Sequence, residues 1–179
     1  MTTLFVMVGI PGSGKSYIAT NSPWLRTTPY VSRDKIRYEF LDERERQLAV
    51  EGCAAGDEVQ YFDCEDQVWE CFVNRIVRHL ELHDSCIADA THINRKSRKK
   101  LIDAVKARIP IDEVVFIVMD TPFCVCVERN NHRDGRARVP MEAMESMYMN
   151  FQPPKAGELG CRRVITISTP ATISGELAI

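Results

Sequence analysis

The chain has 179 residues, a length that suits one domain with an ordinary hydrophobic core. Its net charge of −2 excludes a bulk positive field, so any polyanionic partner must meet a local basic groove. No apolar run approaches the roughly 20 residues of a membrane-spanning helix, and Met1–Thr3 shows no basic leader. We therefore expect a cytosolic protein, or one made in a host's cytosol, with no membrane partner.

The predicted elements of the first half alternate between strand and helix. Leu4–Val8 is wholly apolar, which is typical of a strand buried on both faces of a parallel sheet. Gly52 and Gly56 indicate a break within a helical region. In chain order we expect a strand at 4–8, a loop at 9–14, a helix from 15, a strand at 29–32, a helix at 34–40 and two helical pieces within 41–62.

The second half continues the alternation. We expect helices at 64–83, 95–108, 121–130 and 140–151, strands at 85–89, 113–119 and 164–168, and a polar loop at 131–139. The basic side chains of the helix at 95–108 are expected to face water. Thr121 is the expected cap of its helix, with Pro122 in the first helical position.

This alternation predicts the fold class. Strands that alternate with helices form a parallel sheet with right-handed crossovers. We therefore predict a single α/β domain over 1–179, with a central parallel sheet of about five strands flanked by helices. The tail over about 169–179 carries Pro170 and Gly175, and we expect it to be loose.

The first loop carries a phosphate-binding motif. GIPGSGKS over residues 9–16 matches the pattern G-x-x-x-x-G-K-[ST], between a predicted strand and a predicted helix. Gly12 and Gly14 let backbone N–H groups, including that of Ser13, turn toward phosphates. Lys15 is expected to reach the β- and γ-phosphates and Ser16 to bind the metal ion. The motif predicts a P-loop NTPase fold with ATP and Mg²⁺ as cofactors. Alone it does not separate kinases from GTPases, ATPases or motors, and the three groups of residues that follow favour the P-loop kinase fold.

A carboxylate and an arginine follow the second predicted strand. Asp34 and Arg37 lie one helical turn apart in SRDKIR, so their side chains share a face. Asp34 could accept the proton of a hydroxyl group, and Arg37 could hold a phosphate carried by the same acceptor. The alternative is that Asp34 caps its helix and pairs with Arg37.

A second carboxylate follows the strand at 85–89. Asp89 begins the element DATHIN, at the same edge of the sheet as the phosphate loop. It could orient Arg37 or hold the water shell of a metal ion, and the alternative is a turn-forming cap. We expect His92 to be an ordinary loop histidine.

Two arginines stand at the end of the helix that begins near residue 121. Arg129 and Arg133 lie one turn apart, where this helix enters a polar loop. Phosphoryl transfer needs cations on the migrating charge, and a closing lid can supply them. We predict a lid over about 129–140, and the alternative is a solvated basic helix end favoured by the helix dipole.

These motifs together resemble the 5′-kinase domain of bacteriophage-type polynucleotide kinases. The matching pieces are GIPGSGKS, SRDKIR, DATHIN, RNNHR and VPMEAMESMY, over about residues 4–150. His92 departs from the family pattern, where Asn is usual, and the lid is one residue longer. The family's phage members often carry a phosphatase domain, and this chain has no D-x-D-G-T motif for one.

The resemblance implies a role for each matching acceptor-side residue. Asp34 would be the general base for a 5′-hydroxyl, and Arg37 would bind the acceptor phosphate. Asp89 and Thr91 would support the acceptor site.

It also implies roles on the donor side. Lys15 and Ser16 would hold the ATP phosphates and Mg²⁺, and Arg133 with Arg129 would provide the lid cations.

The leading functional hypothesis is ATP-dependent phosphorylation of the 5′-hydroxyl ends of DNA or RNA, with a single-stranded end as the expected partner. One alternative is a P-loop kinase of a nucleotide, a tRNA or a small metabolite. Another is a non-catalytic ATP-binding module. The sequence leaves open the choice between DNA and RNA, and also the oligomeric state, a homo-oligomer included.

Overall fold

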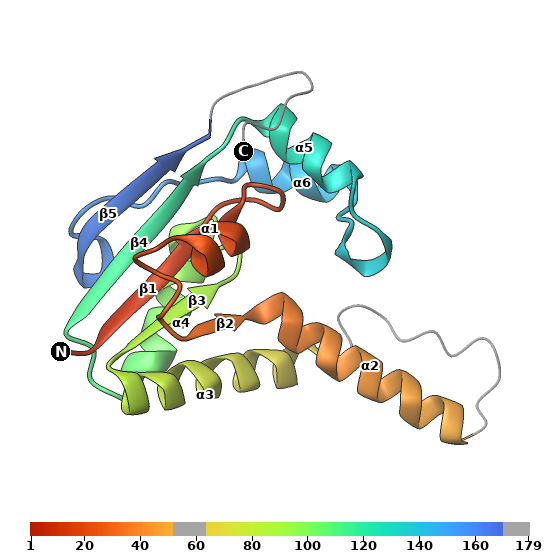
Figure 1. Cartoon of the computed structure of the whole chain (residues 1–179), viewed down its shortest axis with the longest axis horizontal. Helices are drawn as coiled ribbons and strands as arrows, with labels where there is room; N and C mark the ends of the chain where they lie inside the picture. The colour runs from red at the N-terminus through yellow and green to blue at the C-terminus, as the bar shows by residue number, and fades with distance from the viewer. Residues whose placement is uncertain (52–63, 170–179) are drawn as a thin grey trace.

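The computed structural model describes residues 1–51 and 64–169 (Figure 1). Its five strands form one parallel sheet in the order β2-β3-β1-β4-β5. The strands are β1 (Thr3–Val8), β2 (Tyr30–Ser32), β3 (Ser85–Asp89), β4 (Glu113–Asp120) and β5 (Cys161–Ser168). The predicted α/β fold is therefore confirmed. The expected break near Gly52 and Gly56, and the tail beyond Thr169, lie outside the described residues.

Helices flank both faces of this sheet. They are α1 (Lys15–Asn21), α2 (Arg33–Glu51), α3 (Glu65–His83), α4 (Arg95–Lys106), α5 (Phe123–Asn131) and α6 (Met141–Met149), with short 3-10 turns η1 (Gly135–Ala137) and η2 (Glu158–Gly160). None of the helices in the described part of the chain is long and apolar enough to cross a membrane.

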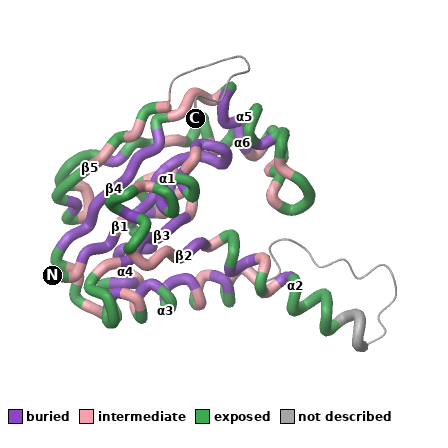
Figure 2. The backbone as a smooth tube through the Cα atoms, viewed as in Figure 1, coloured by how far each residue is buried: buried purple, intermediate pink, exposed green. Residues whose placement is uncertain are grey.

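The sheet has a hydrophobic core on each face, and β1 contributes to both. Leu4 and Val6 pack with apolar residues of α3 and α4. Met7 packs on the opposite face, with Ala19 of α1 and Leu25 of the loop that follows it. Figure 2 shows the central strands as the most continuously buried part of the chain. Because all the strand pairs are parallel, the carboxyl ends of the strands meet at one edge of the sheet, where the phosphate loop lies.

Helix α2 is longer than the sequence analysis predicted. It is continuous over Arg33–Glu51, whereas we expected a short helix over 34–40 followed by a separate helical piece within 41–62. The segment 41–51 lacks an apolar period, so no apolar face marks it as a continuation of the helix over 34–40. It is nevertheless rich in Glu, Arg, Gln, Leu and Ala, which all favour helix, and it contains no Gly or Pro.

Two further local predictions are wrong. Helix α5 begins at Phe123 after Pro122, and the Thr121 hydroxyl donates instead to the Ser13 carbonyl at 2.9 Å. Arg98 of α4 is not solvated but fully buried. Its guanidinium donates to Glu158 and to the carbonyl groups of His92 and Gln152, so a buried charge is paired and hydrogen-bonded as it must be.

Candidate active site

The phosphate loop lies between β1 and α1, and glycines shape its backbone. Gly12 and Gly14 have φ angles of 80° and 91°, in the left-handed region that favours glycine. A Cβ atom at Gly12 would lie 2.3 Å from the carbonyl oxygen of Cys126, so α5 packs directly on the loop. The motif therefore serves this contact as well as the backbone turn.

We expect Gly12→Ala to cost about 1–3 kcal/mol of unfolding free energy, because the methyl group meets backbone that cannot move aside freely. Denaturant unfolding measures this cost, and a titration with ATP shows whether the altered loop still binds the nucleotide. Gly157→Ala is the matched control, since Gly157 has a φ of 85° but nothing within 4 Å of an added Cβ. Equal costs at both positions would show that the contact with α5 contributes nothing.

Lys15 is buried at the start of α1, directly after the loop. Its Nζ atom donates to the Ile10 carbonyl at 2.9 Å. Burial lowers the pKa of Lys15, and the nearby carboxylates of Asp89 and Asp34 oppose this shift. Lys15 therefore interacts electrostatically with two carboxylates, one at the end of β3 and one directly after β2.

Asp89 lies beside Ser16, at the carboxyl end of β3. The Ser16 hydroxyl donates to Asp89 Oδ2 at 2.7 Å, and the Tyr30 hydroxyl donates to the same oxygen at 2.6 Å. Burial and the negative charge of Asp89 raise the pKa of Tyr30 to about 12, so Tyr30 remains a donor. Of the two roles that the sequence left open for Asp89, this position corresponds to the metal side.

The chemistry of this pair fits Mg²⁺. The ion prefers oxygen ligands and usually takes one or two protein groups together with phosphate oxygens and water. Ser16 and Asp89 supply a hydroxyl and a carboxylate within hydrogen-bonding distance of each other. The sequence analysis missed Tyr30, whose role depends on the pairing of β2 with β3.

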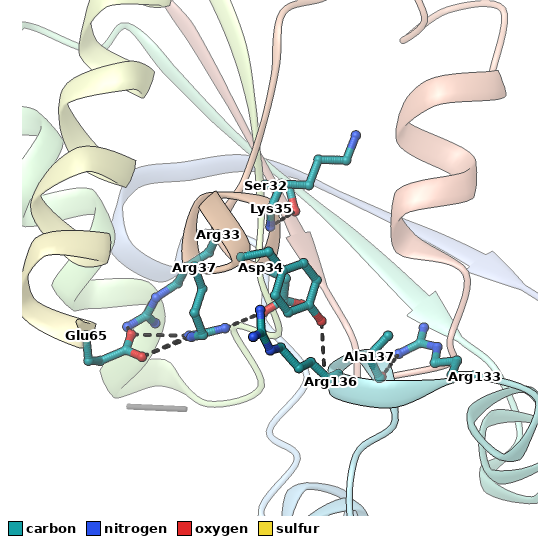
Figure 3. A network of polar contacts seen from close by, with 10 residues as sticks. Ser32, Arg33, Asp34, Lys35, Arg37, Glu65, Arg133, Arg136 and Ala137 are labelled. Carbon is teal, nitrogen blue, oxygen red and sulfur yellow. Dashed lines mark hydrogen bonds and ion pairs between the residues drawn. The ribbon is translucent and has the colours of Figure 1, made fainter. Parts of the chain in front are cut away.

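Asp34 and Arg37 lie at the start of α2, next to a glutamate that the sequence analysis did not identify (Figure 3). Arg37 donates to Asp34 Oδ1 at 2.6 Å and to Glu65 Oε2 at 3.0 Å. Arg33 pairs with the same Glu65. The Arg37 side chain is only 8% exposed, whereas that of Asp34 is 65% exposed. The site therefore offers an open carboxylate backed by a buried arginine.

This geometry matches the alternative in which Asp34 pairs with Arg37. The pairing does not remove Asp34 from chemistry, because its carboxylate remains accessible. It does commit much of the hydrogen-bonding capacity of Arg37 to protein carboxylates. No local pattern identified Glu65, which begins α3 and lies 28 residues from Arg37 in sequence.

The predicted lid is a loop whose two ends are joined by the side chain of Asn130. This buried side chain donates to the Val139 carbonyl at 2.8 Å and accepts from the Val139 N–H at 3.0 Å. Arg129 lies against the phosphate loop, where it donates to the Gly12 carbonyl at 3.3 Å. Arg133 donates to Ala137 at 3.4 Å and is close enough to lower the pKa of Lys15. Both arginines thus belong to the same end of the molecule as the loop.

The segment after β3 is bound to the phosphate loop through its backbone. The Thr91 carbonyl accepts from the Gly9 N–H at 3.0 Å. His92 follows with a φ of 44°, and its buried ring stacks on Phe72. Burial and the neighbouring cations Arg33, Lys15 and Arg98 lower the pKa of His92 from 6.5 to about 3. His92 is therefore a neutral core residue and is more buried than a typical loop histidine.

This burial makes stability depend on pH. Between pH 6.5 and about 3 the unfolded chain binds a proton at His92 that the folded chain does not, so stability falls as pH decreases. The expected slope from this group is about 1.4 kcal/mol per pH unit in that window. His92→Asn keeps a residue that tolerates positive φ and should remove this part of the slope. Urea unfolding at pH 7 and pH 5 measures it, with the exposed His132→Asn as control. An unchanged slope in His92→Asn would contradict the prediction.

Comparison with known proteins identifies the family. Residues 4–154 match the profile of the AAA domain family AAA_33. Comparison with curated protein sequences gives no match.

Several solved structures are similar in fold. A sugar kinase from Janibacter sp. HTCC2649 is 18% identical with a TM-score of 0.57, and the match covers 94% of this chain and 86% of that one. A gluconokinase from Sinorhizobium meliloti 1021 is 19% identical with a TM-score of 0.52, covering 93% and 82%. Chaetomium thermophilum Kti12, in complex with ADP-AlF3, is 17% identical with a TM-score of 0.54, covering 92% and 88%.

These matches support the P-loop kinase fold and do not specifically support the polynucleotide kinases that the motifs resemble. At such low identities the structural likeness concerns the fold. The profile, by contrast, spans most of the chain and includes the phosphate loop, the lid and both strand-end carboxylates. The chain therefore belongs to the AAA domain family AAA_33 and has the fold of P-loop kinases.

Proposed function

We propose that the protein is an ATP-dependent kinase that phosphorylates a hydroxyl group of a small-molecule acceptor. The observation that carries this proposal is the open carboxylate of Asp34, which lies within electrostatic reach of Lys15 in the phosphate loop. A general base and a phosphate-binding lysine at the same edge of one sheet are the two parts that a kinase needs.

Each residue has a distinct task in this proposal. The backbone of Gly12, Ser13 and Gly14 surrounds the ATP phosphates, and Lys15 neutralises the charge of the transferred group. Ser16 and Asp89 would hold Mg²⁺, which would neutralise charge on the β- and γ-phosphates.

The acceptor and the lid complete the arrangement. Asp34 accepts the proton of the attacking hydroxyl, and Arg37 with Glu65 fixes the orientation of that carboxylate. Arg129 and Arg133 add positive charge on the donor side. Thr91 supports the loop through the backbone contact to Gly9.

Two features favour a small acceptor over a polynucleotide. Arg37, which would hold an acceptor phosphate, already donates to two carboxylates and is 8% exposed. Beyond Asp34, the α2 carboxylates Asp42, Glu43 and Glu45 pair with Arg136 and Arg46, so these arginines are also committed to protein carboxylates and not to a chain of phosphates. The fold neighbours named as sugar kinase and gluconokinase agree with this preference.

The second candidate function is phosphorylation of the 5′-hydroxyl end of a nucleic acid. The order of the SRDKIR, DATHIN and RNNHR elements favours it. A tRNA or nucleotide acceptor is also compatible with the same residues.

A screen of acceptors with γ-labelled ATP and Mg²⁺ tests the proposal. It should include sugars and sugar acids, nucleosides, nucleotides, tRNA and 5′-hydroxyl oligonucleotides. Preferred labelling of a small hydroxyl compound, judged by kcat/KM, supports the main proposal. Preferred labelling of the oligonucleotide would replace it with the second candidate. Lys15→Ala serves as the blank for contaminating kinases.

A further inference from the structure

One face of α2 points toward the lid. Asp34, Tyr38, Asp42 and Glu45 follow each other at four-, four- and three-residue spacing, so they lie along one side of the helix. The first of them is the candidate base. The others extend the same face away from the phosphate loop, toward the lid tip, which we define as η1 (Gly135–Ala137).

The lid tip docks on this face through Arg136. Figure 3 shows Arg136 and Ala137 beside the start of α2. The Arg136 guanidinium pairs with Asp42 Oδ1 at 2.7 Å and with Glu45 Oε1. The Tyr38 hydroxyl donates to the Arg136 carbonyl at 3.3 Å. These three contacts join segments that are 91 to 98 residues apart in sequence. They connect the lid to the helix that carries Asp34.

The lid is internally bonded, so the position of its tip affects its arginines. Arg133 donates to the Ala137 carbonyl, next to Arg136. The Ala137 and Arg138 N–H groups close the turn on Asp134 and Gly135.

The charges that act on Tyr38 come from both α2 and the lid. Burial and Asp34 raise the pKa of Tyr38, and Arg133, Arg37 and Arg136 oppose this shift. Tyr38 therefore stands among the candidate base, the lid cation and the docking arginine.

We propose that Arg136 is a positioning residue, whose ion pairs with Asp42 and Glu45 latch the lid tip onto α2 and hold Arg133 over the phosphate loop. The effect on turnover rests on the proposed kinase function, whereas the latch itself is a property of the lid. The acidic face of α2 thus has a role in closing the site.

The strength of the latch suits a lid that must reopen. The side chains of Arg136, Asp42 and Glu45 are 37%, 59% and 51% exposed, so water and salt weaken each ion pair. Two such pairs bias the closed arrangement without locking it. We therefore expect the loss of Arg136 to lower kcat about threefold to tenfold, with little change in the KM for ATP.

Arg136→Ala is the first test variant, and Arg46→Ala is its matched control. Arg46 pairs with Glu43 at 3.0 Å within α2, and its side chain is exposed to 71%, against 37% for Arg136. Hydrogen exchange of the segment 131–139 reports lid docking without any need for activity. We expect faster exchange of this segment in Arg136→Ala, and unchanged exchange and kcat in Arg46→Ala.

A charge exchange distinguishes positioning from general stability. Arg136→Glu should lower kcat and loosen the lid, and adding Asp42→Lys and Glu45→Lys should restore much of both. Raising the salt concentration should loosen the lid of the wild type and leave Arg136→Ala unaffected.

The latch and the kinase function can be refuted separately. If exchange of 131–139 is the same in wild type and Arg136→Ala, the latch is refuted whatever the activity. If exchange changes while no acceptor is phosphorylated by the wild type, the latch stands and the kinase proposal fails. If exchange changes and kcat does not, Arg136 does not position Arg133, and the proposal is overturned at that step.

Discussion

Lys15→Ala should abolish phosphoryl transfer and weaken ATP binding. The Lys15 ammonium is the buried positive charge of the phosphate loop, held at 2.9 Å from the Ile10 carbonyl. Charge that develops on the transferred phosphoryl group needs a preorganised cation, and a buried one is worth more than a solvated one because the local dielectric is low. We expect a loss of at least about 10²–10³-fold in kcat/KM.

Transfer from γ-labelled ATP and equilibrium binding of ATP measure the two effects. Lys99→Ala is the control, because Lys99 is an exposed lysine that pairs with Asp103 on α4. Thermal unfolding shows whether the Lys15 variant is folded. Near-normal turnover in a folded Lys15→Ala protein would refute the phosphate-binding role of the whole loop.

Asp34→Asn should lose most of the turnover and keep both the fold and the affinity for ATP. The amide retains the shape of the carboxylate and can still accept from Arg37, but it cannot take a proton from a hydroxyl group. Loss of a positioned general base typically costs about 10²–10⁴-fold in rate. The fall should appear in kcat, since the proposed role of Asp34 is to take a proton from the acceptor and not to bind ATP.

Glu43→Gln is the matched control for Asp34→Asn. It also neutralises a carboxylate of α2 that pairs with an arginine one turn away. Steady-state kinetics and thermal unfolding should be measured on both variants. If Asp34→Asn unfolds at a lower temperature while its activity per folded molecule is unchanged, Asp34 is a structural partner of Arg37 and not a base.

The sequence predicted the parts of the fold that depend on local patterns. The strand at 85–89 is found with its expected bounds, because an apolar run ends at a charged residue and a turn. The phosphate loop is recognisable because glycine, lysine and serine are each needed at a fixed spacing. Both features can be read within a window of a few residues.

The features that the sequence analysis missed depend on distant partners. Arg98 stands in a basic stretch that indicates a solvated helix face, yet Glu158 pairs with it from 60 residues away. Glu65 and Tyr30 join the site only through the packing of α3 and the pairing of β2 with β3. Tertiary contacts of this kind leave no periodic signal, so local reasoning does not connect such residues with their partners.

The lid combines a feature that was predictable with one that was not. The polar loop over 131–139, which follows Arg129 and contains Arg133, indicated a lid, and Asn130 closes its base as a turn-forming residue can. The docking of Arg136 on Asp42 and Glu45 could not be inferred, because these ion pairs join residues 94 and 91 positions apart in sequence.

The most direct test of the proposed kinase function follows the fate of the γ-phosphoryl group. The protein is incubated with γ-labelled ATP, Mg²⁺ and the pooled hydroxyl acceptors of the screen, and label is divided between inorganic phosphate and acid-stable phosphomonoester. Wild-type protein should place most of the transferred label in phosphomonoester, and Asp34→Asn and Lys15→Ala should form almost none. Release of the label as inorganic phosphate alone, with equal rates in wild type and Asp34→Asn, would show a nucleotide hydrolase instead of a kinase.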